Sequence, residues 1–516
     1  MASTFVGVSI ADRGLAASQI ALATTTNNIS NVNTTGYSRQ TVNQVAVGPA
    51  AVYTRSTVGN GTEVTSVTRV NSYRLDQKYW LENSTLGYYE TTADYLTQIE
   101  TYLDTSASDT TFSKMMSNFY SSLQTLSTDN SSAARQTVLE YGQEICSYFN
   151  ESAEALTELR NEVNIEVKTT VEQINSCASQ IADLNQQITV AATSGASTNE
   201  LEDRRDLLVD ELSELADIEV SATTAYTADD GTTTSTFTVT LNGSTLVGGN
   251  TARGLECYTI TGGGDRDGMY GIRWTDNGTD LSAGDSGTLA AYLDLRDGTG
   301  EDGNYKGILY YMDQLDDFAR TFAAAFNEGV YADGTQYYAG HAGGYGLDGT
   351  TGTRFFTYGD TTSADIESAL AGGQTLDDIY ASVTAASIAL TTDVTADVNK
   401  IAASSSATDA EGNNENANDL IAICQDTNMF NPGSPVDCYD SIIATLGTES
   451  AYASRQNDRQ TSLVAYIDDC RSSVSGVSTN EETAYLTKYQ QAYDASAQAL
   501  TTWSEVLATT INMVSD

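Results

Sequence analysis

Apolar residues recur every seven positions near both ends of the chain. In the first stripe, large residues alternate with smaller ones: Val8, Leu15, Leu22 and Ile29, with Ala11, Ser18, Thr25 and Val32 between them. The second stripe contains Leu486, Tyr493, Leu500, Leu507 and Val514, with Tyr489, Ser496 and Trp503 offset from them. Heptad spacing is typical of helices that pack along a coiled-coil-like seam. We therefore predict two terminal helices that pair with each other and with copies in other molecules.

Turn and capping residues set the limits of these two helices. The first helix is expected to stop between Asn33 and Gly36, because glycine readily adopts the left-handed conformation that ends many helices. The second is expected to begin in the segment from Ser478 to Glu482, which contains two overlapping capping boxes. Residues 38–70 are rich in Val and Thr and predict an extended linker.

The middle of the chain is predicted to be helical first and mixed afterwards. Residues 75–215 keep apolar spacings of three and four, broken at Ser194-Gly195, which predicts a helical bundle or rod. Residues 237–241 then alternate apolar side chains with threonine before Asn242-Gly243, a sequence typical of a tight hairpin turn. A second strand pair near 258–274 and a helix over 308–326 are expected to follow.

These patterns together predict an α+β fold that is mainly α. The expected divisions are 1–74, the N-terminal coiled-coil helix and linker; 75–335, a helical rod domain with a β-hairpin region; 336–400, a small β-rich inserted outer domain; 401–475, helices that return to the rod domain from about Ala396 onward; and 476–516, the C-terminal coiled-coil helix. The fold of the insert stays open, because its sequence shows few long periodic elements.

Charge is concentrated away from the two ends. The sequence has 69 Asp and Glu against 24 Lys and Arg, a formal charge of −45 that repels nucleic-acid phosphates and anionic lipids. Residues 1–60 and 484–516 are nearly neutral, which makes the ends candidates for burial in an interface. Because an isolated two-helix hairpin is marginal in water, we expect the ends to be largely disordered in the monomer and to fold on assembly. The alternative is that both helices dock on a core within their own chain.

The sequence argues against membrane insertion and cysteine-based metal or redox sites. No apolar run reaches the ~18 residues that a membrane span needs. The first residues lack the pattern of a secretory signal peptide, so export without a cleavable signal is expected. Because the six cysteines show no C-x-x-C spacing, they are expected to be small buried hydrophobes, and a Cys424–Cys438 disulfide stays open.

Catalytic chemistry finds little support in the sequence. The only histidine, His341, lies in a glycine-rich run and is expected in a surface loop. The segment from Gly262 to Gly268 lacks both the Gly-Lys-Ser/Thr of a P-loop and the final Glu of an EF-hand, which favours a β-turn. With 69 acidic residues, two carboxylates close in sequence do not indicate a glycosidase site. We predict that the chain is not an enzyme and binds no cofactor or metal.

The most specific motif lies where the first helix is expected to end. It reads Asn27, Asn28, Ile29, Ser30, Asn31, Val32, Asn33, Thr34, Thr35, Gly36, Tyr37, Ser38, Arg39 and Gln40. This segment resembles the Asn-Asn-(Ile/Leu)-x-Asn-x-Asn-Thr-x-Gly-(Tyr/Phe) signature of flagellar axial proteins, and its Tyr-Ser-Arg-Gln ending is most similar to the hook-associated protein 1 family. The motif is expected to fix the turn that leaves the first helix.

The other end of the chain carries a second part of the resemblance. The matching residues are Gly476 and Val477, then Glu481 and Glu482, then Gln490, Gln491, Ala492, Tyr493, Ala495, Ser496 and Ala497. They look like the family's Ser-Gly-Val, acidic and Gln-Gln-Ala-Tyr-x-Ala-Ser-Ala pattern. Similarity also runs through parts of 293–356 and 401–418, whereas the segment between Phe356 and Ile401 follows no pattern of the family.

The resemblance implies a structural subunit between the hook and the filament of a bacterial flagellum. It implies export by the flagellar type III apparatus to an extracellular position, a ring of copies with the terminal helices lining an inner tube, and three partners: hook protein, hook-associated protein 3 and an export chaperone. The expected assembly residues are Val8, Leu15, Leu22, Ile29, Val32, Leu486, Tyr489, Tyr493, Leu500, Trp503, Leu507 and Val514. The alternatives are another axial subunit, such as hook-associated protein 3 or a flagellin, and a secreted acidic adhesin or glycan-degrading enzyme.

Overall fold

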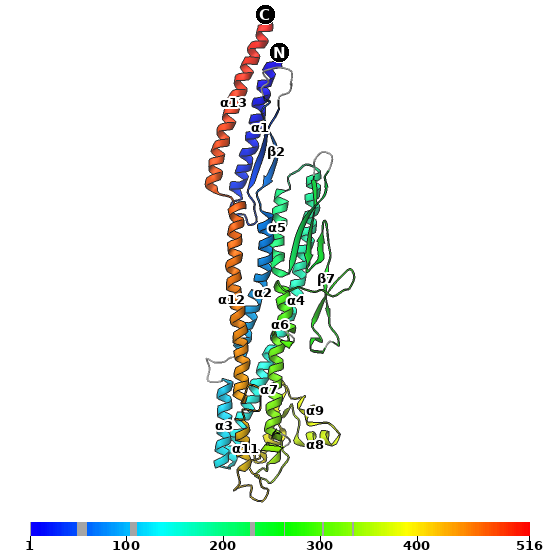
Figure 1. Cartoon of the computed structure of the whole chain (residues 1–516), viewed down its shortest axis with the longest axis vertical. Helices are drawn as coiled ribbons and strands as arrows, with labels where there is room; N and C mark the ends of the chain where they lie inside the picture. Colours follow the sequence, from blue (N-terminus) through cyan, green and yellow to red (C-terminus); the bar gives the residue numbers. More distant parts are fainter. Residues whose placement is uncertain are drawn as a thin grey trace.

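The molecule is an elongated arrangement of long helices with both termini at one end (Figure 1). The computed structural model describes residues 2–48, 59–103, 111–227, 233–262, 264–301, 304–332 and 335–515. Within these residues helices predominate, and the strands form small antiparallel sheets. The predicted mainly α, α+β class is therefore confirmed.

The two terminal helices lie antiparallel at the end that carries the termini. They are α1 (Ala2–Ser30) and α13 (Thr479–Ser515). A hairpin of β1 (Gln40–Ala46) and β2 (Thr62–Arg69) packs along α1. We call α1, α13 and this hairpin the terminal unit. It projects from the rest of the molecule, which we call the body (Figure 1).

Long helices form the part of the body that adjoins the terminal unit. The helices α2 (Tyr73–Leu103) and α12 (Pro435–Ser475) pack against each other, and α4 (Ser132–Thr193) turns back into α5 (Asn199–Leu215). Gly195 forms this turn with φ +73°, in the left-handed region that favours glycine. The Ser131 side chain caps α4, and Ser434 begins α12 with a capping box.

The body contains two apolar cores along its length. The proximal core, nearer the terminal unit, lies between α4, α5 and a sheet of β3 (Ile218–Thr227), β4 (Thr233–Leu241), β5 (Ser244–Gly248) and β6 (Thr251–Ala252). Asn242 and Gly243 join β4 to β5 with φ +41° and +74°, which confirms the predicted hairpin. The predicted second strand pair is β7 (Leu255–Thr259) with β8 (Tyr270–Trp274), and α6 (Thr288–Asp297) covers the core beside it.

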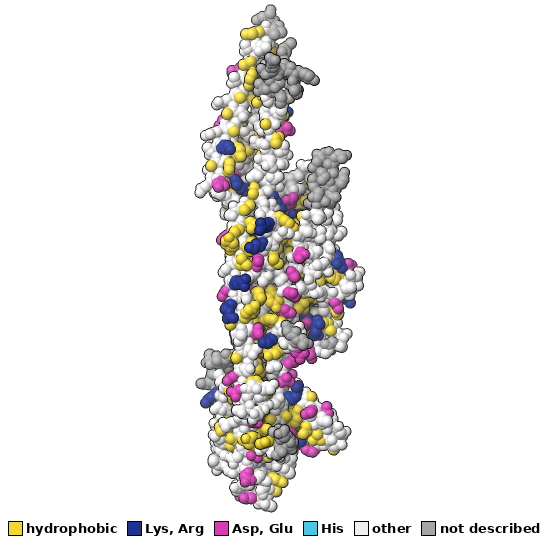
Figure 2. Space-filling view, in the orientation of Figure 1, with side chains coloured by type: hydrophobic (Ala, Val, Ile, Leu, Met, Phe, Trp, Pro, Cys, Tyr) yellow, Lys and Arg dark blue, Asp and Glu magenta, His cyan; other side chains and the backbone are white. Residues whose placement is uncertain are grey.

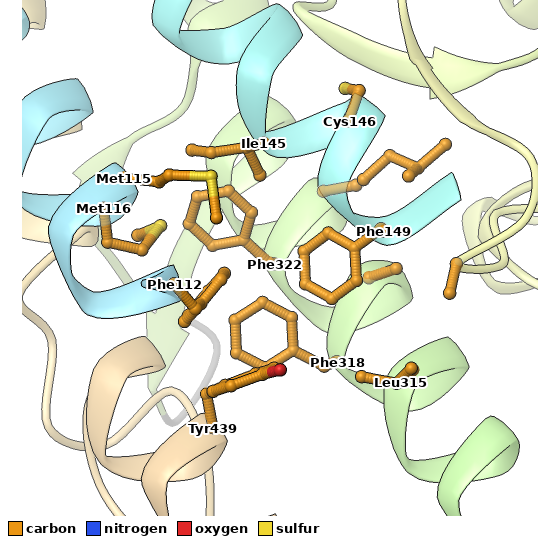
Figure 3. Packing of buried hydrophobic residues seen from close by; sticks show 14 of the residues in the cluster. Phe112, Met115, Met116, Ile145, Cys146, Phe149, Leu315, Phe318, Phe322 and Tyr439 are labelled. Atoms are coloured by element: carbon orange, nitrogen blue, oxygen red, sulfur yellow. The ribbon is translucent and has the colours of Figure 1, made fainter. Parts of the chain in front are cut away.

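The distal core, at the opposite end from the termini, is rich in phenylalanine (Figure 3). It brings together α3 (Phe112–Thr128), α7 (Ile308–Glu328), α11 (Glu415–Ile423) and parts of α4 and α12. Phe318 lies at its centre: its ring stacks on Phe149 at a centroid distance of 5.2 Å and meets Phe112 edge-on at 5.2 Å. Such offset and edge-on aromatic contacts add stability beyond the apolar area they bury.

Residues 336–400 consist of short elements packed on the distal core. They are β10 (Thr335–Ala339), which pairs with β9 (Gly329–Ala332), β11 (Phe356–Tyr358), which pairs with β12 (Ile388–Leu390), and α8 (Ser363–Ala371), α9 (Leu376–Tyr380) and α10 (Thr392–Ala396). Phe355, Phe356 and Tyr380 are buried in the distal core. A Cβ on Gly142 of α4 would lie 2.7 Å from the Phe355 ring, so the segment approaches α4 closely. The expected insert thus shares the distal core, although α8 and α9 protrude sideways (Figure 1).

The prediction that His341 lies in a surface loop is wrong. Its side chain is fully buried between the rings of Phe326 and Phe355. Nδ1 lies 2.7 Å from the carbonyl oxygen of Thr353, and Nε2 accepts a hydrogen bond from the amide of Ala402 at 2.8 Å. The backbone beside His341 packs closely against its neighbours and leaves no room for a side chain, since a Cβ on Gly340 would lie 2.3 Å from the Asn327 carbonyl oxygen. The glycine-rich run therefore indicates tight packing, not exposure.

The expected return to helix after Ala396 is also wrong. The helix α10 ends at Ala396, and α-helix resumes only with α11 at Glu415. In between, the short turn of 3-10 helix from Val398 to Lys400 leads into a buried extended segment. Ser404 of that segment pairs with Tyr345, so its backbone hydrogen bonds go to the glycine-rich loop instead of to a helix.

The cysteines are free thiols within the body. Cys146, Cys177 and Cys424 are buried, whereas Cys257, Cys438 and Cys470 are partly exposed. Cys424 and Cys438 do not form a disulfide. The expectation of small buried hydrophobes therefore fits half of the set.

Candidate assembly interface

Small residues of α1 form the seam with α13. The seam positions are Gly7, Ala11, Gly14, Ser18, Ala21, Thr25 and Asn28. A Cβ on Gly7 would lie 2.3 Å from the Trp503 ring, and one on Gly14 would lie 3.0 Å from Ser496 Oγ. One heptad forward on α1 thus corresponds to one heptad back on α13. Glycine and alanine let the two helices approach closely, since helix separation depends on the side chains at the contact.

The predicted stripe of large residues on α1 lies beside this seam, not in it. Val8, Leu15, Leu22 and Ile29 are half-buried, and each follows a seam residue by one position; Val32 is 37% exposed. The smaller residues of the predicted stripe, Ala11, Ser18 and Thr25, do lie in the seam. Within one molecule, the seam therefore runs through half of the predicted stripe and lies one residue before its large members, because this pair uses small contact residues.

The predicted stripe on α13 lies toward α1. Leu486, Tyr489, Tyr493, Leu500 and Leu507 are half-buried, and Trp503 rests on Gly7. The side chain of Val514 is outside the described residues. Apolar side chains also remain exposed on both helices: Phe5 and Ile20 of α1, and Val506 and Met513 of α13. The terminal unit therefore presents apolar surface to further helices.

Asn28 is the centre of the hydrogen bonds that close the base of the terminal unit. Its Nδ2 donates to the Gln40 carbonyl at 2.9 Å and to Glu482 Oε2 at 3.0 Å. Its Oδ1 accepts from the Gln40 amide at 2.9 Å and from the Tyr37 hydroxyl at 2.8 Å. Because Asn28 is 1% exposed, all of these bonds are shielded from water. A single amide thereby joins the end of α1, the strand after it and the start of α13.

Arg39 and Glu482 complete this connection. Arg39 Nε donates to Glu482 Oε1 at 2.8 Å, and the Arg39 amide donates to the carbonyl of Ser475 at 2.7 Å. The Glu482 side chain is almost fully buried. It was expected to cap its own helix, but it instead neutralises Arg39 and accepts from Asn28. Charge-assisted bonds of this kind are among the stronger ones in proteins.

A second set of contacts joins the linker to α5. The Ser38 amide donates to Asp203 Oδ2 at 3.1 Å, and Gln40 Nε2 donates to Glu200 Oε1 at 2.9 Å. Arg69 at the end of β2 reaches the same helix, with Nη1 3.1 Å from Asp203 Oδ1. Burial and the nearby carboxylates of Glu200 and Asp203 raise the pKa of Tyr37 well above its usual value. The phenol therefore stays a hydrogen-bond donor.

Arg471, near the end of α12, fastens α12 to α2 and α5. Its Nε donates to Asp76 Oδ1 at 2.9 Å, and its Nη2 donates to Asp210 Oδ2 at 3.0 Å. The guanidinium lies over the Tyr79 ring at 4.3 Å, and Trp80 Nε1 donates to Asp210 Oδ1 at 2.6 Å. Burial raises the pKa of Asp210 to about 6, although Arg471 opposes that shift.

We call these linked residues the joint. The joint consists of Asn28, Tyr37, Ser38, Arg39, Gln40, Arg69, Asp76, Glu200, Asp203, Asp210, Arg471 and Glu482. A cavity of about 480 Å³ lies within it, lined in part by Asn31, Thr34, Gly36, Gly476 and Val477. Gly36 has φ +76°, so the turn itself requires glycine.

The remaining motif residues divide between the turn and the open side of α13. Asn31 Nδ2 donates to Asn27 Oδ1 at 3.0 Å, and the Thr34 hydroxyl donates to Asn31 Oδ1 at 3.2 Å, which stabilises the turn; Asn33 is exposed. On α13, Ser496 and Ala497 are half-buried, whereas Gln490, Gln491, Ala492 and Ala495 are exposed. The sequence did not indicate Arg69, Asp203 or Arg471, because their partners are far away along the chain.

Metal-binding groups and membrane-spanning helices were also sought in the described part of the chain. No group of His, Cys, Asp or Glu among the described residues could hold a metal ion. No helix in that part combines the length and apolar character needed to cross a membrane.

Models of three protein families match the chain. The flagellar hook-associated protein FlgK helical domain matches residues 96–356, the flagella basal body rod protein matches residues 9–37, and the C-terminal part of the flagellar basal body rod FlgEFG protein matches residues 471–513. The two terminal matches include Asn28, Tyr37, Arg471 and Glu482 of the joint.

Curated relatives cover nearly the whole chain. Flagellar hook-associated protein 1 of Bacillus subtilis is 32% identical over 536 residues, covering 99% of both chains. Flagellar hook-associated protein 1 of Escherichia coli is 29% identical over 587 residues, covering 97% of this chain and 98% of that one. The solved structure of the flagellar hook junction protein FlgK from Burkholderia pseudomallei has a similar fold, with a TM-score of 0.58 and 17% identity over 78% of this chain and 100% of that chain.

Proposed function

The chain belongs to the flagellar hook-associated protein 1 family, and from this premise we propose that it is a structural subunit of the hook–filament junction that assembles through its terminal unit. The observation that carries the assembly step is the packing of α1 and α13, which pair with each other yet keep apolar side chains on their outer faces. The twelve residues expected from the sequence to carry assembly, from Val8 to Val514, remain the proposed assembly residues.

The seam within one molecule leaves much of the stabilisation of the terminal unit to assembly. Along α1 the seam is made of Gly, Ala, Ser, Thr and Asn, which bury little apolar area, and apolar burial stabilises by roughly 25 cal/mol per Å². The larger Leu15, Leu22 and Ile29 stay half-exposed beside the seam. Helices of neighbouring copies would bury them, which is the physical reason to expect the ends to order on assembly.

The joint suits a subunit whose ends form a tube and whose body forms the wall around it. It ties the terminal unit to α5 and α12 through charge-assisted and buried hydrogen bonds. We further propose that copies form a ring, with hook protein on one side of the ring and hook-associated protein 3 on the other. The proposal also includes export by the type III apparatus with a chaperone bound to the C-terminal helix.

The proposal is tested in flagellated cells whose only copy of this protein carries Leu500→Asp and Leu507→Asp. Placing two carboxylates on the α13 stripe should prevent helix packing, because a buried charge without a partner is strongly unfavourable. We expect filaments to detach and monomeric flagellin to accumulate in the medium.

The matched control is Val190→Asp, since Val190 is 60% exposed on α4 of the body. The control should retain filaments. Retained filaments in the double variant would contradict the proposed role of the terminal unit.

A further inference from the structure

A strip of basic and aromatic side chains lies on the outer face of α12. Tyr452, Arg455, Arg459 and Tyr466 are all exposed, and their spacings of three, four and seven place them on one side of the helix. Lys78 of the adjacent helix α2 is exposed as well. We call these five residues the cationic strip.

Lys78 belongs to the strip because of the register between α2 and α12. On α2 it lies between Asp76 and Glu82, which bond to Arg471 and Gln460 of α12. This places Lys78 opposite the part of α12 that carries Tyr466. Figure 2 shows Lys and Arg side chains among hydrophobic ones along this flank of the molecule.

The cations of the strip have no carboxylate partner within the described residues. Lys78, Arg455 and Arg459 form no ion pair within the described residues, whereas other cations of the chain, such as Arg69 and Arg354, are paired. Arg455 and Arg459 are also one helical turn apart, where like charges cost a helix about 0.2–0.5 kcal/mol.

A surface of the opposite charge lies on another side of the body. A groove of about 410 Å³ between α2, α3 and α4 is lined by residues that include Thr101, Glu144 and Glu151. Exposed Glu158 and Glu162 continue the acidic character along α4. We call Glu144, Glu151, Glu158 and Glu162 the acidic groove.

The helix α2 separates the two surfaces. It contacts α12 through Glu82 and Tyr89, and it borders the groove through Thr101.

We propose that the cationic strip of one copy docks in the acidic groove of the next copy. The inference rests on the proposed function, because it requires copies of this chain to lie side by side. Complementary surfaces on different sides of one molecule make a head-to-tail contact that propagates around a ring or helix. Arginine and tyrosine are the residues that most often dominate interface energetics, and complementary charges fix the register of the partners.

The test exchanges the charges of the two surfaces in the full-length chain, in cells that carry no other copy. One variant is Arg455→Glu with Arg459→Glu, a second is Glu151→Arg with Glu158→Arg, and a third combines all four changes. Each double variant should shed flagellin into the medium. The fourfold variant should recover filament attachment, because the strip and groove are complementary again with reversed signs.

The control is Lys114→Glu with Arg273→Glu, an exposed and a partly exposed cation outside the strip that give the same change in net charge as the strip reversal. The control should keep its filaments. Unchanged attachment in the double variants, or a fourfold variant no better than either of them, overturns the docking contact. If Leu500→Asp with Leu507→Asp loses filaments while the strip reversal does not, the junction role stands and only the docking contact falls.

Discussion

Acidification is expected to destabilise the distal core through His341. Its Nε2 accepts the Ala402 amide hydrogen, so protonation of that nitrogen would leave the amide without its acceptor. Burial, with a smaller contribution from the charge of Arg135, lowers the pKa of His341 from 6.5 to about 4. Between these values the folded chain binds fewer protons than the unfolded chain. The stability contributed by the neutral ring is therefore complete above pH 6.5 and is lost as the pH falls toward 4.

The size of the effect follows from the two pKa values. Linkage between pKa 6.5 and about 4 lowers the free energy of unfolding by about 2 kcal/mol from pH 7.5 to pH 5.0. Buried carboxyl groups act in the opposite direction: burial raises the pKa of Asp210 and of Asp313 to about 6, so the folded chain binds more protons at these sites. A comparison with a variant that cannot titrate at position 341 is therefore needed.

The assay is urea denaturation followed by far-UV circular dichroism for the wild type and His341→Gln. The variant should be less stable at pH 7.5, because it loses the fit between Phe326 and Phe355. The difference in free energy of unfolding should shrink by about 2 kcal/mol at pH 5.0, since only the wild type loses its neutral ring. His341 is the only histidine, so no other imidazole contributes. A difference that stays constant over this range would refute a buried neutral histidine.

Three further predictions concern the terminal unit, the joint and the distal core. Gly7→Val should weaken filament attachment in cells because its Cβ would lie 2.3 Å from the Trp503 ring, whereas Gly48→Val, where a Cβ would meet nothing within 4 Å, should not; equal effects would contradict the seam. Asn28→Leu leaves buried partners without hydrogen bonds, a cost of roughly 3 kcal/mol, and should release flagellin, whereas Asn43→Leu at an exposed position of β1 should not. Phe318→Ala should lower the free energy of unfolding, measured by urea denaturation, by about 3–5 kcal/mol. Tyr337→Ala should change it little, because Tyr337 is 64% exposed, and equal effects would count against the central place of Phe318.

Features encoded by neighbouring residues could be predicted from the sequence. The Asn242-Gly243 turn and the break at Ser194-Gly195 depend on the backbone preferences of those residues alone. The terminal helices were predictable because heptad spacing reflects helix geometry. Even there, the seam on α1 could not be placed correctly, since the size of the contact residues depends on Trp503 of the other helix.

Features that depend on distant residues could not be predicted. The motif around Asn28 was recognised from its resemblance, but its role as a connector requires Glu482 at the other end of the chain. His341 was misplaced because flanking glycines indicate loops when neither Phe326 nor Ala402 is known to pack around them. The packing of residues 336–400 on the distal core could not be predicted either, because it depends on α4, where Gly142 leaves space for the Phe355 ring.

The two glycines of the α1 seam affect the register between the terminal helices. Gly7 and Gly14 are one heptad apart, so Trp503 would find a second glycine opposite it if α13 slid by about 10 Å along α1, at 1.5 Å per residue. Such a slide would carry Glu482 past Asn28 and break their bond. The two glycines alone therefore fit Trp503 in two alignments. The hydrogen bond between Asn28 and Glu482, at the base of the helix pair and far from the chain ends, selects one of them.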